Sequence, residues 1–237
     1  MPPAAPTPLR LLLPRRLAWA DVDRLGEALS SQPAARAVTL EGGEPGVFCE
    51  GGALDDPEPP RPRRFGALLA ALQRDPRPVI ALVDGAALGA GVGLAAAADL
   101  VLATARARFA LPETLLGLVP AMVFPFLAQR VGVARARLLA LGAEPLDAQE
   151  AWRWGLVDEV TADLPGALQR HGRRLARMDA AALARLKALV AEHFAAPPGY
   201  EDPAAQALVE LLERGEGRGR VRRFLAGEAP WPDEGTP

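Results

Sequence analysis

The sequence is short of several residue types that mark particular classes of protein. Its 237 residues include one cysteine, Cys49, so no disulfide can form within the chain, and we expect a reducing, cytoplasmic setting. Basic and acidic residues nearly cancel, at a formal net charge of −2, which argues against a nucleic-acid binder held by bulk electrostatics. No apolar run is long enough for a membrane span, and the N-terminal apolar patch lacks a preceding positive stretch. We therefore expect a soluble protein without a signal peptide, a membrane segment or a nucleic-acid partner.

What the sequence does contain is an alternation of short apolar runs with helical patterns. Hydrophobic residues make up 50% of the chain, which is enough for a full core. The runs predict strands at residues 9–13, 37–42, 79–85 and 99–104, and a weaker one at 156–161. Helical spacing predicts a helix over 20–31 and another that contains Phe65, Leu68, Leu69 and Leu72. This alternation predicts an α/β fold with a parallel sheet covered on both faces, whose ligands bind beyond the carboxyl ends of its strands.

The predicted strands stop near residue 165, and helical patterns follow over 164–178, 180–194 and 204–227, with a hinge at 196–203. We therefore divide the chain into a core domain, 1–164, and a C-terminal helical region, 165–237. The helices of that region pack either on their own core or on neighbouring subunits.

Residues 85–98, GAALGAGVGLAAAA, carry no side chain that can accept a proton, bind a metal or attack a carbonyl. They follow a predicted strand, and a glycine-rich turn that enters a helix there would present backbone N–H groups at the helix N-terminus, a site for negative charge. Two alternatives stay open. The glycines serve only tight helix–sheet packing, or they form a dinucleotide site, which the missing G-x-G-x-x-G register argues against.

Two further stretches follow the second and fourth predicted strands: VFCEGGALDD (47–56) and RARFALPETLLGLVPAMVFPFLAQRVG (106–132). In order and spacing, these two stretches and residues 85–98 resemble the crotonase (enoyl-CoA hydratase/isomerase) superfamily from about residue 37 to 160. The resemblance implies a crotonase-type spiral of ββα units with a C-terminal helical layer. It also implies that 165–237 mediates assembly into a homotrimer or a dimer of trimers.

The resemblance assigns roles by position. Gly52 and Ala90 match the two backbone N–H donors of an oxyanion hole around a thioester carbonyl, and Glu113 matches one of two acid/base glutamates. The second glutamate falls at Gly93 and is absent, and Ala53 replaces the usual aspartate after the first donor. Ala90 also stands where the family has a glycine, and an alanine fits there only if its φ is negative.

The chain resembles the dehydratases of polyketide β-branching cassettes in two respects: it lacks the second glutamate, and the sequence of residues 109–132 is similar. Such enzymes remove water from a 3-hydroxy-3-methylglutaryl group on an acyl carrier protein and leave a 3-methylglutaconyl thioester. The resemblance implies this lyase activity, with Glu113 as the catalytic residue. We expect a phosphopantetheine or CoA thioester as the substrate carrier, and no cofactor or metal of the protein's own. The apolar neighbours Leu111, Leu115 and Leu116 are expected to raise the pKa of Glu113 toward neutrality.

Rival functions stay open at this stage. One is an enoyl-CoA isomerase or hydratase of fatty-acid metabolism, of which the isomerase also works with one glutamate. A decarboxylase of the same cassette would act on the dehydrated product, and a scaffold would bind a carrier protein without turnover. For Glu113 itself, the structural alternative is an N-cap or first-turn glutamate after Pro112.

Other candidates are weaker. Cys49 is expected to be a buried structural thiol, His171 and His193 to lie on the surface or cap helices, and Trp152 and Trp154 to pack. Residues 51–64, rich in proline and charge, form a loop that is either disordered or functional. Its Arg61, Arg63 and Arg64 are candidates for the phosphates of the carrier, although we favour a solvated loop.

Overall fold

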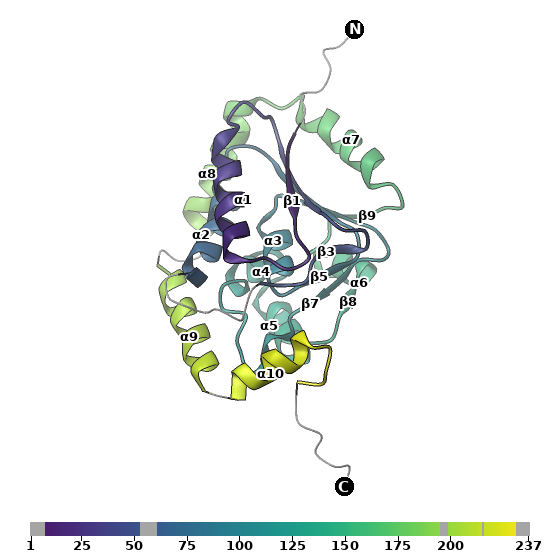
Figure 1. The fold of residues 1–237 in the computed structure, drawn as a ribbon. Coiled ribbons are helices and arrows are strands. Elements are labelled where there is room, and N and C mark those ends of the chain that lie inside the picture. The colour runs from purple at the N-terminus through teal and green to yellow at the C-terminus, as the bar shows by residue number, and fades with distance from the viewer. Residues whose placement is uncertain (1–7, 53–60, 195–198, 215, 231–237) are drawn as a thin grey trace.

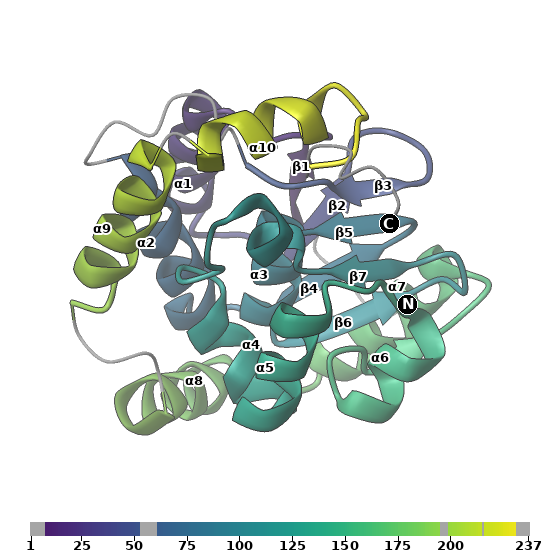
Figure 2. The same ribbon diagram turned by 90° about the horizontal axis from the view of Figure 1, so that it is seen from below.

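The structure is a computed structural model that describes residues 8–52, 61–194, 199–214 and 216–230. Five parallel strands form the larger sheet (Figures 1 and 2). Their order is β1 (Leu9–Leu13), β2 (Val38–Gly42), β4 (Val79–Val83), β6 (Leu100–Ala103) and β9 (Glu159–Val160). Each lies within a segment predicted as a strand, because buried parallel strands are near-continuous apolar runs.

A second, smaller sheet was not predicted. It contains β3 (Val47–Cys49), β5 (Ala86–Leu88), β7 (Arg108–Ala110) and β8 (Leu146–Asp147), of which the first three are parallel and β8 is antiparallel. Each of β3, β5 and β7 follows a strand of the larger sheet and precedes a helical segment. The chain therefore repeats a strand–strand–helix unit along its length, which confirms the predicted spiral of ββα units.

Helices of the core cover the sheets with their apolar faces. They are α1 (Trp19–Ser31), α2 (Arg61–Arg74), α3 (Ala90–Ala97), α4 (Phe124–Val131), α5 (Val133–Gly142) and α6 (Ala148–Trp154), with the short 3-10 helix η1 (Pro112–Leu116) before α4. In α1, Val22, Leu25 and Leu29 are buried at helical spacing. In α2, Phe65, Leu68, Leu69 and Leu72 are buried, as their spacing predicted.

The assignment of Arg61, Arg63 and Arg64 to a loop was wrong, because α2 begins at Arg61. Helical geometry places Arg63 and Arg64 on the solvent side, where they pair with Asp202 at 2.9 Å and Asp23 at 2.8 Å. Residues 53–60 of the predicted loop lie outside the described residues.

The C-terminal region is helical, with α7 (Leu164–Leu175), α8 (Ala180–Phe194), α9 (Glu201–Glu213) and α10 (Glu216–Leu225). The predicted single helix at 204–227 is thus two helices. Figures 1 and 2 show α7 and α10 on different sides of the molecule. The apolar face of α7 packs on β4 and β6 through Ala167, whereas α9 contributes Ala204 and Ala205 to the main core. The helices α7 and α9 therefore pack on the core of this chain, whereas Leu186, Val190 and Phe194 of α8 are exposed. The role of the region in trimer assembly stays a prediction. No helix within the described ranges is long and apolar enough to cross a bilayer.

Candidate active site

Residues 85–98 fold as a turn, a three-residue strand and a helix. Gly85 has φ +100°, and a Cβ atom there would lie 1.8 Å from the carbonyl oxygen of Gly46, so no other residue fits. Gly89, with φ +51°, immediately precedes α3, which begins at Ala90. Among the described non-glycine residues only Ala143 has a positive φ, so Ala90 meets the requirement for a negative φ. The segment therefore delivers a helix N-terminus, while its glycines also permit close packing.

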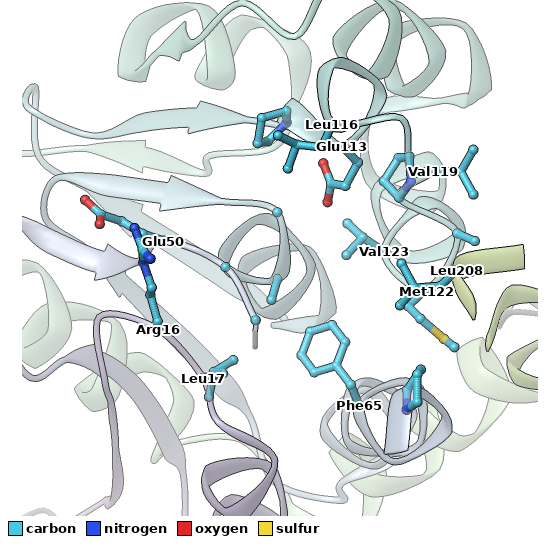
Figure 3. A pocket seen from close by; sticks show the side chains of 18 of the residues that line it. Arg16, Leu17, Glu50, Phe65, Glu113, Leu116, Val119, Met122, Val123 and Leu208 are labelled. Carbon is cyan, nitrogen blue, oxygen red and sulfur yellow. The ribbon is translucent and has the colours of Figure 1, made fainter. Parts of the chain in front are cut away.

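Three loops from the carboxyl ends of β3, β5 and β7 meet at one cavity (Figure 3). Gly51 and Gly52 come from the first loop, Gly89 and Ala90 from the second, and Glu113 from the third. Backbone bonds hold the first two: the Gly51 carbonyl accepts from the amide of Leu17 at 2.9 Å, and the Gly89 amide donates to Ala110 at 2.9 Å. The fold thus brings together all three residues predicted to form the site.

The backbone amides of Gly52 and Ala90 are the predicted oxyanion donors. Within the described part of the chain, neither amide donates to a backbone carbonyl or a side-chain acceptor. The Ala90 amide stands at the first turn of α3, where N–H groups have no partner inside the helix and the helix dipole is positive. Their role as a pair of donors to one oxygen stays a prediction.

Glu113 lies in the first turn of η1, and its carboxyl points into the cavity (Figure 3). No side chain caps η1, and Glu113 is not its N-cap but a first-turn glutamate after Pro112, as the structural alternative has it. Its Oε2 is nevertheless buried without a hydrogen-bond partner among the described residues. Burial raises the pKa of Glu113 from 4.5 to about 7, against a smaller opposite effect of its own backbone amide. The expected shift toward neutrality is therefore confirmed, although two of its three predicted apolar neighbours, Leu111 and Leu116, are buried and Leu115 is 38% exposed.

The remaining walls of the cavity are largely apolar and come from helices distant in sequence. They are formed by Val22, Phe65, Leu116, Val119, Met122, Val123, Ala204, Leu208, Phe224 and Leu225. Figure 3 shows Arg16 and Glu50 at one end and Val119, Met122 and Leu208 at the other. The sequence did not indicate that α9 and α10 contribute to the cavity wall, because it shows only that these helices have an apolar face.

Glu50 is the other carboxylate that lines the cavity, and it differs from Glu113 in being paired. Arg15 donates to its Oε2 at 3.0 Å. Figure 3 shows the Glu50 carboxyl away from the Glu113 carboxyl, across the cavity. Glu113 is thus the one unpaired carboxylate among the described lining residues.

The weaker candidates lie outside this constellation. Cys49 is fully buried, and burial raises the pKa of its thiol to about 12, as expected of a structural residue. His171 pairs with Glu159 at 2.8 Å, and His193 lies beside Phe194 in α8. The prediction that Trp152 packs was wrong, since this side chain is 51% exposed on the outer face of α6.

Trp154, in contrast, packs against the main core as predicted. The side chain of Arg61 and the position of Ala53 lie outside the described residues. The described residues contain no group of three or more histidine, cysteine or acidic side chains close enough to share a metal ion.

Comparison with known proteins indicates the family of the chain. The enoyl-CoA hydratase/isomerase family matches residues 22–208. The bacillaene synthase dehydratase PksH of Bacillus subtilis is 31% identical over 207 residues, which cover 83% of this chain and 80% of that protein. The PksH crystal structure superposes with a TM-score of 0.79 at 24% identity, over 95% of this chain and 96% of that one.

An enoyl-CoA hydratase structure from Mycobacterium avium gives a TM-score of 0.79 at 30% identity, over 93% and 92% of the two chains. The family match covers most of the chain, and the fold and the three converging loops agree with it. The chain therefore belongs to the enoyl-CoA hydratase/isomerase family, the crotonase superfamily.

Proposed function

We propose that this protein, a lyase of the enoyl-CoA hydratase family, removes water from a 3-hydroxy-3-methylglutaryl thioester on an acyl carrier protein. The product is the 3-methylglutaconyl thioester of polyketide β-branching. The single observation that carries the proposal is the buried, unpaired carboxyl of Glu113 in the cavity where the loops of Gly52 and Ala90 meet. The likeness to the dehydratase PksH supports the choice of reaction.

The chemistry follows from one carboxylate and two amides. The Glu113 carboxylate takes a proton from C2, and the electrons of that C–H bond move into the thioester as an enolate. The amides of Gly52 and Ala90 stabilise the enolate oxygen, and loss of one such donor typically costs about 3–4 kcal/mol. The carboxylic acid then gives its proton to the departing hydroxyl, water leaves, and the C2–C3 double bond forms. Glu113 returns to its starting state, and a pKa near neutrality suits both transfers.

Neither a cofactor nor a metal enters this scheme. The proposal places the enzyme in the cytoplasm, as a homotrimer or a dimer of trimers. Sedimentation of the purified protein at micromolar concentration tests the assembly, and a monomer there would contradict it.

A second candidate is an enoyl-CoA isomerase that acts on a thioester with a neutral acyl chain. One observation favours it: the end of the cavity formed by Val119, Met122 and Leu208 is apolar, whereas a hydroxymethylglutaryl group ends in a carboxylate. Burying an unpaired carboxylate is unfavourable by several kcal/mol or more. In this reaction Glu113 would move a proton from C2 to C4 of a 3-enoyl thioester.

Direct assay separates the candidates. The purified protein is incubated with 3-hydroxy-3-methylglutaryl carrier protein, with the same acyl group on CoA, and with a 3-enoyl-CoA, and mass spectrometry and chromatography follow the products. Loss of 18 Da from the carrier-bound substrate, faster than from the CoA ester, supports the proposal. Turnover of the 3-enoyl thioester alone, which conserves mass and shifts the double bond, assigns the isomerase function.

A further inference from the structure

The position at which the resemblance places a second glutamate, Gly93, is buried in α3. The Gly93 amide donates to the carbonyl of Gly89 at 3.2 Å, so the two glycines lie one helical turn apart at the N-terminal end of α3. Residue 89 lies close to Glu113: a Cβ atom there would lie 3.1 Å from Oε1. A side chain at residue 93 would thus start one turn away from the Glu113 carboxyl, next to the cavity.

The space at that position is already filled. A Cβ atom on Gly93 would lie 2.8 Å from Cγ2 of Val123 and 3.3 Å from Cδ1 of Leu69. Both contacts are with core side chains, since Val123 is 3% exposed and Leu69 is fully buried. Even an alanine therefore requires Val123 to move.

Val123 has little freedom to move. Its amide donates to the carbonyl of Pro120 at 3.0 Å, and its carbonyl accepts from the amide of Leu127 at 3.1 Å in the first turn of α4. A β-branched side chain also has few rotamers at χ1. Val123 nevertheless lines the cavity, and Figure 3 shows it facing inward below Glu113. A fixed apolar side chain thus occupies the wall beside the acid.

We propose that Val123 is a specificity-determining residue: position 93 is a glycine, and the Val123 side chain fills the space that any longer side chain there needs, so the cavity stays a site with one acid. The inference rests on the proposed role of Glu113. Hydration of an unbranched 2-enoyl thioester benefits from two acids. One carboxylate takes a proton from water as the oxygen bonds to C3, the double-bond electrons move into the enolate, and the second acid protonates C2. With a glycine at position 93 and Val123 filling the space beside it, the protein has no second acid and hydrates such a substrate slowly.

The test installs the second acid and makes room for it. Gly93→Glu with Val123→Ala is expected to raise kcat/KM for hydration of an unbranched 2-enoyl-CoA at least about tenfold over the native protein, since a positioned acid or base typically contributes roughly 10²–10⁴-fold. The matched control is Gly93→Gln with Val123→Ala, which has the same size and cannot exchange a proton. Gly93→Glu alone is expected to lower the Tm and give no gain.

The pH–rate profile identifies the cause of any gain. A gain confined to the glutamate double variant, with an added ionisation that the glutamine variant lacks, supports the inference. An equal gain in both double variants contradicts it, because the gain then comes from the larger cavity and not from the added acid. If the glutamate double variant has the same Tm as its glutamine control and still shows no gain in hydration, that result also contradicts the inference. A gain in Gly93→Glu alone, at the native Tm, shows that Val123 blocks nothing.

The steric part is tested without a buried charge. Gly93→Ala is expected to lower the Tm, and the loss is expected to be smaller in a Val123→Ala background because the contact is gone. Equal losses in the two backgrounds overturn the inference even if the glutamate variants do not fold. These readouts use variants and an unbranched enoyl thioester, so they are separate from the native dehydration assay that tests the proposed function.

Discussion

Glu113 and Gly89 lie so close together that a Cβ atom on residue 89 would stand 3.1 Å from Oε1 of Glu113. Gly89 also has φ +51° and ψ −109°, a conformation that other residues rarely adopt. One glycine therefore meets two requirements. It turns the chain from β5 into α3, and it leaves room for the carboxyl that η1 brings from the next ββα unit.

Replacing this glycine is expected to affect both stability and activity. Gly89→Ala forces an unfavourable backbone conformation, which costs about 1–3 kcal/mol, and displaces the Glu113 carboxyl. The expected result is a lower Tm with a lower kcat. The control is Gly172→Ala in α7, where nothing lies within 4 Å of the added Cβ and the Tm should not fall. A Gly89→Ala protein with native Tm and kcat would remove the steric argument.

The Ala90 amide is tested with proline, which has no N–H. Ala90 is the first residue of α3, a position at which helices accept proline. Ala90→Pro is expected to fold and to lose about 10²–10³-fold in kcat, the usual effect of removing one oxyanion donor. Ala90→Gly retains the N–H and should retain turnover. Circular dichroism confirms folding, and a folded proline variant with native kcat means that this amide does not contact the reacting oxygen.

Burial of Glu113 makes stability depend on pH. Its pKa is about 7 in the folded protein and 4.5 in the unfolded reference, so the folded state binds the proton more tightly. The loss in free energy of unfolding that the buried carboxylate causes is absent below about pH 4.5 and grows as the pH rises through 7. It reaches roughly 3 kcal/mol by the constant of 1.36 kcal/mol per pKa unit. Glu113→Gln carries no such charge. Its Tm advantage over the native protein is therefore expected to increase from pH 4.5 to 8 in thermal melts, and a constant difference would contradict the shift.

The strands of the larger sheet could be predicted from sequence because each is a buried apolar run of several residues. The strands β3, β5 and β7 have three residues each, too few for any periodicity, so β5 within GAALGAG was interpreted as a turn. The position of Trp152 on an exposed face likewise depends on how α6 is rotated, which aromatic content does not reveal.

The sequence indicated three residues of the cavity and missed most of its walls. Gly52, Ala90 and Glu113 follow from the resemblance of three ordered stretches, and the fold brings them to one cavity. Leu208 and Phe224 come from helices more than 90 residues after Glu113, and their place on the wall depends on packing. The exclusion of a side chain at Gly93 by Val123 is a tertiary contact that the sequence does not encode locally.

The reaction itself is expected to depend on pH with one ionisation. Glu113 must be a carboxylate to accept the C2 proton, so kcat/KM should rise with pH and level off above about 7, the pKa of the buried group. The measurement is the initial rate of dehydration between pH 5 and 9. A rate that falls throughout this range would mean that the protonated form starts the reaction.

The central claim is that Glu113 performs the proton transfers, and Glu113→Gln tests it most directly. Glutamine keeps the size of the side chain and cannot exchange a proton, so turnover of 3-hydroxy-3-methylglutaryl carrier protein is expected to fall about 10²–10⁴-fold. Binding of the thioester and the native fold should persist. The parallel variant Glu50→Gln changes the other carboxylate of the cavity, which is paired with Arg15. A large loss in Glu113→Gln supports the account, whereas full turnover there together with loss in Glu50→Gln would contradict it.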